Sequence, residues 1–191
     1  MRRLVPTVLL ASLVLAGAPA GVAGGSEVVV DATEWSGHDT FLPSQVDILR
    51  GGTVRFVFSG TRSHTATDGT GLDLYDSGVV APGGPDEVVQ FVAAGNYAVS
   101  CTLHVDMNAT VFVPVSVTPA SGVSGTNLTI RWASVVASGG LVVDVQLRKP
   151  GADWKLWRAG TPAKSGTIDA KRVGTWRFRA RLVRSATAQV G

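Results

Sequence analysis

One short segment, Cys101-Thr-Leu-His104-Val-Asp-Met107, concentrates residue types that the chain otherwise uses sparingly. It holds the single cysteine, one of three histidines and the only methionine besides Met1. Thiolate, imidazole and thioether groups are soft or borderline metal ligands. Strand-like runs flank the segment on both sides, so a hairpin would hold its two ends. The segment is therefore a candidate metal-binding loop.

The residue types in this loop match one kind of metal site closely. Two imidazoles and one thiolate in a trigonal plane, with a weak axial thioether, form a blue-copper electron-transfer site. Cys101, His104 and Met107 would supply three of those ligands, and the second imidazole must come from His38 or His64. His64 lies just beyond a predicted strand, where it can reach the same pole of a sandwich as a hairpin loop. We therefore select His64 and interpret His38 as a solvated loop residue.

Other interpretations of the loop stay open on the residues alone. Cys101 could be a buried, inert thiol near an exposed histidine. Zinc is a further candidate, although structural zinc prefers several thiolates. A nucleophilic cysteine would need a histidine partner and an oxyanion hole, and the segment offers no helix N-terminus for Cys101. A multicopper oxidase is excluded, because its trinuclear cluster needs many histidines and the chain has three.

The composition and the strand pattern indicate an all-β protein. Hydrophobic residues make up 45% of the 191 residues, glycine is frequent and only 16% of residues are charged, which favours a compact, turn-rich β fold. Short runs of alternating polarity predict strands in the first half of the chain: Val28–Val30, Gln45–Ile48, Thr53–Phe58, Glu87–Val92, Tyr97–Ser100 and Thr110–Val117. Pro114 places the last run at a sheet edge or a bulge. This set predicts a β-sandwich or barrel.

The pattern restarts after Thr118-Pro119 and predicts a second domain. Its expected strands are Thr126–Ala133, Leu141–Leu147, Trp154–Arg158 and Thr175–Leu182. Charge divides at the same place: residues 24–118 carry eleven acids against three arginines, a formal charge of −8, whereas residues 119–191 carry three acids against twelve lysines and arginines, or +9. Such asymmetry indicates two domains, 24–118 and 119–191.

The N-terminus has the layout of a secretory signal peptide, predicted over residues 1–23. A basic start is followed by an apolar run and by a small-residue cleavage site, with cleavage after Ala20 or Ala23. We therefore expect a secreted or extracytoplasmic protein, in the periplasm or at the cell surface, without a transmembrane anchor. In such a compartment cysteines usually pair, and Cys101 has no partner in this chain.

Residues 41–117 resemble the small blue-copper proteins of the plastocyanin/amicyanin type, the cupredoxins. The resemblance lies in Phe41-Leu-Pro43 with the following Val46-to-Phe56 stretch, in Ser63-His64-Thr65, and in Ala94-to-Met107. It implies a Greek-key β-sandwich that holds one type 1 copper ion through His64, Cys101, His104 and Met107. The protein would transfer single electrons and would not be an enzyme.

The same resemblance assigns roles around the site and shows two departures. The family often has Asn after its first histidine, where it ties the copper loops together and bonds the thiolate, and Thr65 stands there in this chain. A Pro commonly precedes the second histidine, where this chain has Leu103. The family's loop histidine has an edge exposed on an apolar patch, so a redox partner is expected to dock at His104, with Leu103 and Val105 as patch residues. Leu72, Tyr75 and Phe112 are expected in the core.

The second domain resembles a fibronectin type III or other Ig-like sandwich. Trp132 would be the core tryptophan of the second strand, and Trp176 would lie near the aromatic-corner position. The chain stops before a closing strand, so this sandwich is expected to be incomplete. Arg177, Arg179 and Arg181 alternate on one strand face, which is either solvated or a docking surface for an anionic polymer or for the acidic first domain. Export makes nucleic acid an improbable partner.

Three functions are compatible with these expectations. The first is an exported type 1 copper protein that carries single electrons. The second is an extracytoplasmic copper carrier or buffer, which would use the same ligands but release the metal readily. The third is an extracellular binding module in which the cupredoxin fold is only a scaffold.

Overall fold

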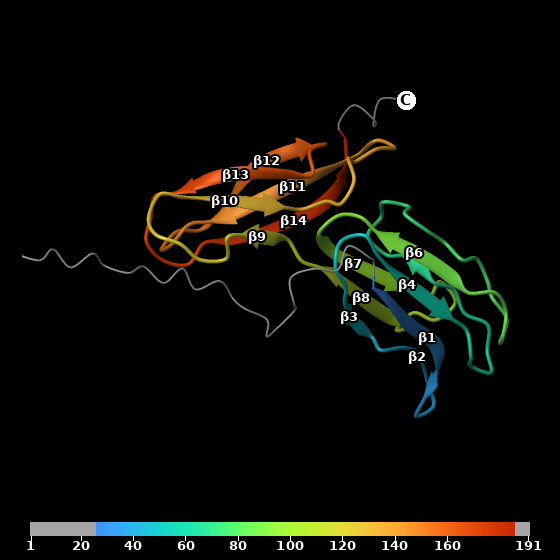
Figure 1. Cartoon of the computed structure of the whole chain (residues 1–191). Coiled ribbons are helices and arrows are strands. Elements are labelled where there is room, and N and C mark those ends of the chain that lie inside the picture. The colour runs from blue at the N-terminus through green and yellow to red at the C-terminus, as the bar shows by residue number, and fades with distance from the viewer. Residues whose placement is uncertain (1–25, 186–191) are drawn as a thin grey trace, which may run out of the picture. The chain divides into compact units, whose positions relative to one another are not determined.

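The computed structural model describes residues 26–185, and all of its regular structure is β. Fourteen strands in this range form two four-stranded and two three-stranded sheets (Figure 1). The prediction of an all-β chain is confirmed. The signal peptide predicted over residues 1–23 lies outside the described residues. Between residues 26 and 185 no helix is long and apolar enough to cross a membrane.

The chain divides into two compact units, an N-terminal unit over Ala23–Pro114 and a C-terminal unit that begins at Val115. The sequence placed the boundary after Thr118 instead. The run predicted as one strand over Thr110–Val117 is in fact two strands, because Pro114 has no N–H to continue the ladder. β8 (Asn108–Val113) belongs to the N-terminal unit, and β9 (Ser116–Thr118) pairs with β10 of the C-terminal unit.

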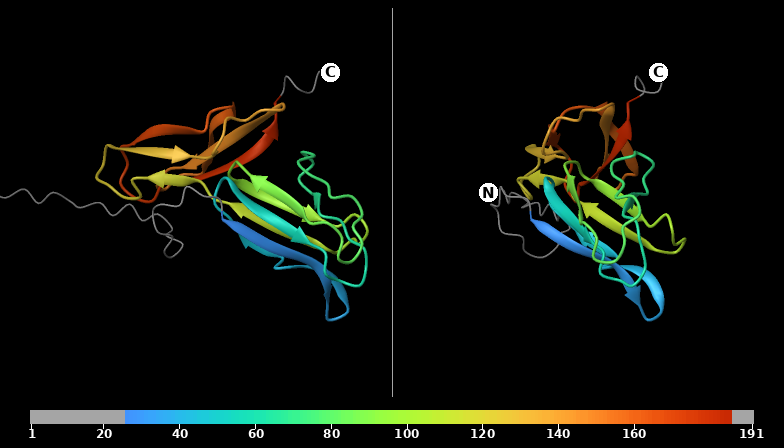
Figure 2. Two further views of the ribbon diagram at one scale, coloured as in Figure 1. Left: turned by 45° about the vertical axis from the view of Figure 1, so that its right-hand side comes forward. Right: turned by 90° about the vertical axis from the view of Figure 1, so that its right-hand side faces the viewer.

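The N-terminal unit consists of two four-stranded sheets that face each other, as Figure 2 shows. The first sheet has the order β2-β1-β4-β6 and is formed by β1 (Glu27–Trp35), β2 (His38–Leu42), β4 (Gly52–Val57) and β6 (Glu87–Phe91). The second has the order β3-β8-β7-β5 and contains, besides β8, β3 (Gln45–Asp47), β5 (Thr67–Asp68) and β7 (Gly95–Ser100). β1 runs parallel to β4, and β3 parallel to β8; the other pairs are antiparallel.

The core of this unit follows from strict alternation along its central strands. Val54 and Phe56 on β4 are fully buried, as are Val99 on β7 and Val111 on β8. Each such side chain contributes about 1.5–3 kcal/mol through its burial. The aromatic ring of Tyr75 stacks on Phe56 with a centroid distance of 5.9 Å, so this half-buried side chain packs against the core. The packed sandwich gives the loops at its poles a rigid base.

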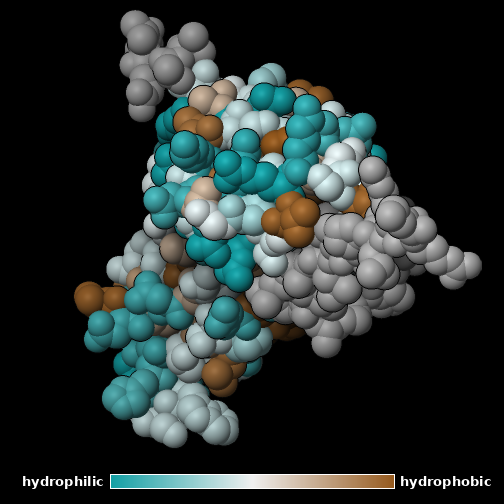
Figure 3. Space-filling model, turned by 90° about the vertical axis from the view of Figure 1, so that its left-hand side faces the viewer, coloured by the Kyte–Doolittle hydropathy of each residue, from teal (hydrophilic) through white to brown (hydrophobic). Residues whose placement is uncertain are grey.

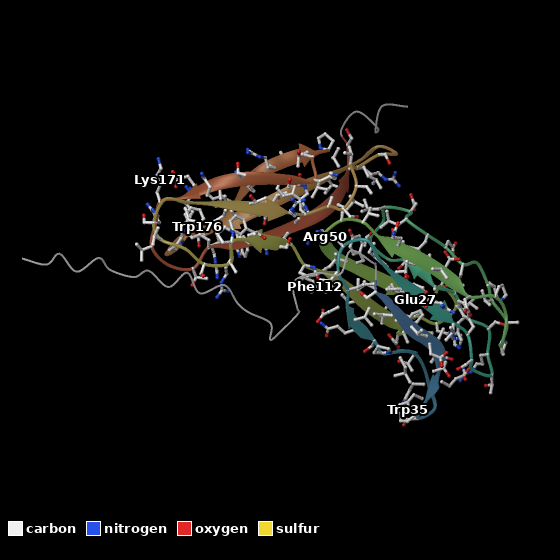
Figure 4. All side chains as sticks on the ribbon, in the orientation of Figure 1. Glu27, Trp35, Arg50, Phe112, Lys171 and Trp176 are labelled. Atoms are coloured by element: carbon white, nitrogen blue, oxygen red, sulfur yellow. The ribbon has the colours of Figure 1, made fainter. Side chains whose placement is uncertain are left out.

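One hairpin of the first sheet was not predicted. β1 continues to Trp35 and turns through Ser36 and Gly37, which both have positive φ values of 51° and 81°, into β2. Such a two-residue turn matches the natural twist of a hairpin. His38 is therefore the first residue of a strand and not a loop residue, although its side chain is exposed as expected. Trp35 lies at the tip of this hairpin (Figure 4).

The C-terminal unit is built from two three-stranded antiparallel sheets. One has the order β13-β10-β9, with β10 (Thr126–Arg131) and β13 (Ser165–Ala170). The other has the order β12-β11-β14, with β11 (Leu141–Arg148), β12 (Trp154–Thr161) and β14 (Arg177–Arg184). β13 was not predicted from the sequence, because its pattern of small and polar residues carries a weak strand signal.

Tryptophans form the centre of this second core. Trp132 is fully buried and meets Trp157 edge to face at 5.8 Å; it follows β10 directly and does not belong to it, in contrast to the expectation. Trp176 is also buried, and its indole N–H donates to the carbonyl of Arg172 at 3.0 Å. Gly166 lies against Trp132, where an added Cβ would come within 3.0 Å of the indole ring. A larger residue at position 166 would therefore require the indole ring of Trp132 to shift by a few tenths of an ångström.

Candidate metal centre

Two loops at one pole of the N-terminal unit present the predicted ligands. His64 lies between β4 and β5 and is fixed by paired backbone hydrogen bonds with Val80, of 3.0 and 2.9 Å. Cys101 follows β7 directly, and its N–H donates to the carbonyl of Met107 at 3.0 Å, which closes the base of the second loop. Inside that loop, the N–H of Met107 donates to the carbonyl of His104 at 3.1 Å. Both loops are thus held by backbone bonds next to strand ends.

Three side chains converge between these loops. The Nδ1 atoms of His64 and His104 lie 3.2 Å apart, and Cys101 Sγ lies 3.5 Å from Nδ1 of His104. One ligand atom from each of the three residues lies within 4.8 Å of the other two. His64 is fully buried, Cys101 is buried as a free thiol, and the His104 side chain is 23% exposed.

These separations suit a single metal ion. Metal–nitrogen and metal–sulfur bonds at such sites are about 2.0–2.3 Å long, so two atoms bound to one ion lie within roughly 4.4 Å of each other. Both measured separations, 3.2 and 3.5 Å, meet this condition. Without a metal, one proton shared between the two Nδ1 atoms would hold the imidazoles in the same place. The donor set, two imidazoles and one thiol, therefore fits an ion without rearrangement of these contacts.

Met107, the fourth predicted ligand, is almost fully buried at the end of the same loop, with 1% exposure. A buried thioether fills space in a core as readily as it binds a metal. Its assignment as the axial ligand stays a prediction.

Thr65 connects the two loops, although it replaces the asparagine of the family pattern. Its backbone N–H donates to Cys101 Sγ at 3.3 Å, and its hydroxyl oxygen accepts the N–H of Thr102 at 2.8 Å. The N–H stabilises negative charge on the sulfur, and the hydroxyl holds the first residue after Cys101. Thr65 therefore performs both tasks that the resemblance assigns to asparagine.

Two carboxylates that were not predicted from the sequence lie next to the histidines. Glu34 and Asp39 are partners in the β1–β2 hairpin. Glu34 Oε1 lies 3.5 Å from Nε2 of His64, and Asp39 Oδ2 lies 3.7 Å from Nε2 of His104. Each imidazole thus presents one nitrogen to the cluster and the other towards a carboxylate, at separations of 3.5 and 3.7 Å that are those of an ion pair and longer than a hydrogen bond. The only sequence signal was an acid on each side of the Trp35-to-His38 turn, which becomes informative once the hairpin is known.

Hydrogen bonds and one arginine fix these carboxylates. Glu34 accepts the backbone N–H groups of Thr61 and Arg62 at 2.8 and 2.9 Å. The Thr61 bond is the main cause that lowers the pKa of Glu34; burial opposes it, and smaller contributions from Arg62 and His64 lower the pKa further. Arg62 also pairs with Asp39 at 3.0 Å. Glu34 is therefore ionised at neutral pH.

Two apolar side chains near His104 in the same loop are exposed. Leu103 is 47% exposed and Val105 93% exposed, which agrees with the expectation that they flank the histidine on the surface. Trp35 is another large exposed side chain of this unit, at 67%. The docking of a redox partner at this surface stays a prediction.

No protein-family model matches the sequence, and no curated protein matches it either. Solved structures that resemble part of the chain are cupredoxins. A purple cupredoxin from Nitrosopumilus maritimus is 18% identical with a TM-score of 0.40, covering 45% of this chain and 98% of its own. Oxidised plastocyanin from Dryopteris crassirhizoma is 20% identical with a TM-score of 0.40, and the match covers 46% of this chain and 100% of the plastocyanin. Pseudoazurin from Methylobacterium extorquens AM1 is 26% identical with a TM-score of 0.39, and the match covers 46% of this chain and 75% of the pseudoazurin. The candidate metal centre is defined by the side chains of His64, Cys101 and His104.

Proposed function

We propose that the N-terminal unit binds one copper ion through His64, Cys101 and His104, with Met107 as a weak axial ligand, and carries single electrons. One observation supports this most strongly: two imidazole nitrogens and one cysteine sulfur converge, with separations of 3.2 and 3.5 Å. The protein would act as an electron carrier without catalysing a reaction.

The donor set favours copper over zinc. Structural zinc sites use four strong ligands and commonly several thiolates, whereas this cluster offers one thiolate and two imidazoles. That set, with a methionine close in the same loop, suits type 1 copper. Copper bound in this way exchanges single electrons between its two common oxidation states.

The residues around the cluster have separate tasks in this proposal. Glu34 and Asp39 orient the two imidazoles through their outer nitrogens, and Thr65 holds the cysteine loop against the histidine loop. His64 is shielded from solvent, so His104 is the ligand through which an electron would enter or leave. Leu103 and Val105 would contact the redox partner. Rigid loops serve this task, because little rearrangement then accompanies electron transfer.

We place this function outside the cytoplasm. The support is the signal-peptide layout of residues 1–23, which would be removed on export. A lone buried cysteine is compatible with an oxidising compartment when a metal and the protein interior protect it.

Copper titration tests the proposal. One equivalent of Cu(II) added to the full chain should produce an intense blue sulfur-to-copper charge-transfer band. Cys101→Ser should abolish the band, and His38→Ala, which alters an exposed histidine of the first sheet, should leave it unchanged. A colourless complex, or equal colour in the Cys101 variant, would refute the proposal.

The same preparation separates an electron carrier from a copper carrier. An electron carrier should be reduced and reoxidised repeatedly without loss of the metal. Rapid transfer of copper to a chelator, together with an absence of reversible redox cycling, would favour the carrier function instead.

A further inference from the structure

The outer face of the β12-β11-β14 sheet carries three cross-strand pairs whose charge balance changes along the sheet. Asp144 is opposite Arg181, Gln146 is opposite Arg179, and Arg148 is opposite Arg177. Asp144, Gln146 and Arg148 alternate with the buried side chains of β11, so all three pairs lie on the solvent side. The pairs thus run from an opposite-charge pair to a like-charge pair.

In two of these pairs the arginine of β14 has an acidic or polar partner, and in the third pair its partner is another arginine. Arg181 forms an ion pair with Asp144 at 3.1 Å, and Nε of Arg179 donates to Gln146 at 2.7 Å. Arg148 and Arg177 face each other with like charge, and no ion pair within residues 26–185 is recorded for either. Like charges directly opposite each other destabilise a sheet. A bound anion would remove this repulsion.

Aromatic rings hold the cations of this face in place. The guanidinium of Arg179 lies 4.4 Å from the centroid of Trp154, and that of Arg148 lies 5.4 Å from the same ring. The ammonium of Lys149 lies 5.7 Å from the centroid of Trp176. Stacked guanidinium groups keep their N–H edges available and lose less conformational freedom when they bind a ligand.

An open groove lies at the uncompensated end of the face. It has a volume of about 440 Å³, and its lining includes three cations, one acid and one hydroxyl group: Arg148, Lys149, Arg177, Asp153 and Thr175. The groove therefore has an excess of positive charge. Hydrophilic residues also predominate on the side of the molecule that Figure 3 shows.

We propose that this groove binds a phosphate group, either free or within a polyphosphate chain. Guanidinium groups form bidentate, charge-assisted hydrogen bonds to phosphate. Arg148, Arg177 and Lys149 all line the groove, so each can donate to the oxygens of an anion bound there. The groove belongs to the C-terminal unit alone, so this inference does not depend on the metal centre.

Calorimetric titration of the full chain at low salt tests the site, with inorganic phosphate and inorganic polyphosphate as separate probes. Arg177→Gln and Arg148→Gln should each weaken binding at least tenfold, because each removes a charge-assisted hydrogen bond to the anion. Arg131→Gln is the matched control: it removes the same charge from an exposed position on β10 of the other sheet. Binding of both probes identifies a site for a single phosphate, and binding of polyphosphate alone identifies a site for the chain.

The shift in melting temperature caused by the anion gives a second readout, and a purely structural role of Arg177 would not change this shift. Four of the five tryptophans lie in the C-terminal unit, so tryptophan fluorescence follows its unfolding. Without anion, Arg177→Gln should raise the melting temperature, because the repulsion with Arg148 is gone. With polyphosphate, the wild type should gain stability and this variant should not. Equal binding losses in the Arg131 and Arg177 variants, or no binding of either probe, would overturn the proposal.

Discussion

At the residue scale, the main feature of the candidate site is the negative charge next to its two histidines. Glu34 and Asp39 place two carboxylates against the outer nitrogens of His64 and His104, and Arg62 pairs with Asp39. Negative charge near a metal stabilises its more positive oxidation state. The two carboxylates should therefore lower the reduction potential of the centre.

Neutral variants of these carboxylates test this effect. Glu34→Gln should raise the reduction potential of the copper-loaded protein and weaken copper binding by about 10–100-fold. The N–H groups of Thr61 and Arg62 bond to different oxygens of Glu34, so glutamine can keep only one of these bonds, and chemical denaturation should report the accompanying loss of stability. Glu27→Gln removes the same charge at the far end of β1, where Glu27 pairs with Arg55, and should change the potential much less. A lower potential in the Glu34 variant, measured by voltammetry, would contradict the assigned role.

Substitution by phenylalanine should change the free energy of unfolding in opposite directions at Tyr75 and Tyr97. The Tyr75 hydroxyl is buried and has no hydrogen-bond partner among residues 26–185, whereas the Tyr97 hydroxyl donates to the carbonyl of Ala93 at 2.7 Å. Tyr75→Phe should therefore increase the free energy of unfolding by about 1 kcal/mol, and Tyr97→Phe should decrease it by about as much. Both rings keep their aromatic contacts as phenylalanine. Chemical denaturation of both variants measures the difference, and a loss of stability in each would refute the hydrogen-bond account.

At the element scale, the site depends on how firmly its two loops are joined. Thr65 provides the connection through its hydroxyl group and Thr102. Thr65→Val keeps the shape of the side chain but leaves that N–H without its acceptor, which should cost about 1 kcal/mol of stability. The same change should weaken copper binding, because the cysteine loop is no longer fixed.

Thr65→Ser is the matched control for this prediction, since it retains the hydroxyl group. Its stability and its copper affinity, measured by denaturation and by competition with a chelator, should stay close to those of the wild type. If the valine and serine variants behaved alike, the hydroxyl group would have no role in joining the loops.

The elements also show what a sequence can predict. The alternation of apolar and polar residues predicted the central strands β4, β7 and β8. One face of each strand is buried, so every second residue is apolar. The cysteine loop was recognised from its rare residue types. The β1–β2 hairpin was missed because Trp35 and His38 at its tip are exposed and its turn has no Asn-Gly or Asp-Gly signal. Glu34 and Asp39 were consequently missed as well, since only strand pairing places them against the histidines.

At the scale of the whole molecule, charge is divided between the two predicted domains, at −8 and +9. The candidate metal centre lies in the acidic part. Cations should approach the centre faster than anions at low ionic strength, and salt should screen this preference.

Small redox reagents of opposite charge can measure the electrostatic field around the candidate metal centre. Oxidation of the reduced copper protein by the tris(phenanthroline)cobalt(III) cation should slow as ionic strength rises, whereas oxidation by the hexacyanoferrate(III) anion should accelerate. Stopped-flow kinetics over a salt series provides both slopes. If the two slopes had the same sign, the local negative charge would not govern access to the site.

X-ray absorption at the copper edge, on the full chain loaded with one equivalent of copper, tests the central claim most directly. The account predicts two imidazole nitrogens and one sulfur at short distance, and loss of that sulfur in Cys101→Ser. A copper ion surrounded only by nitrogen and oxygen in the wild type would contradict it, because the metal would then lie away from the cluster of His64, Cys101 and His104.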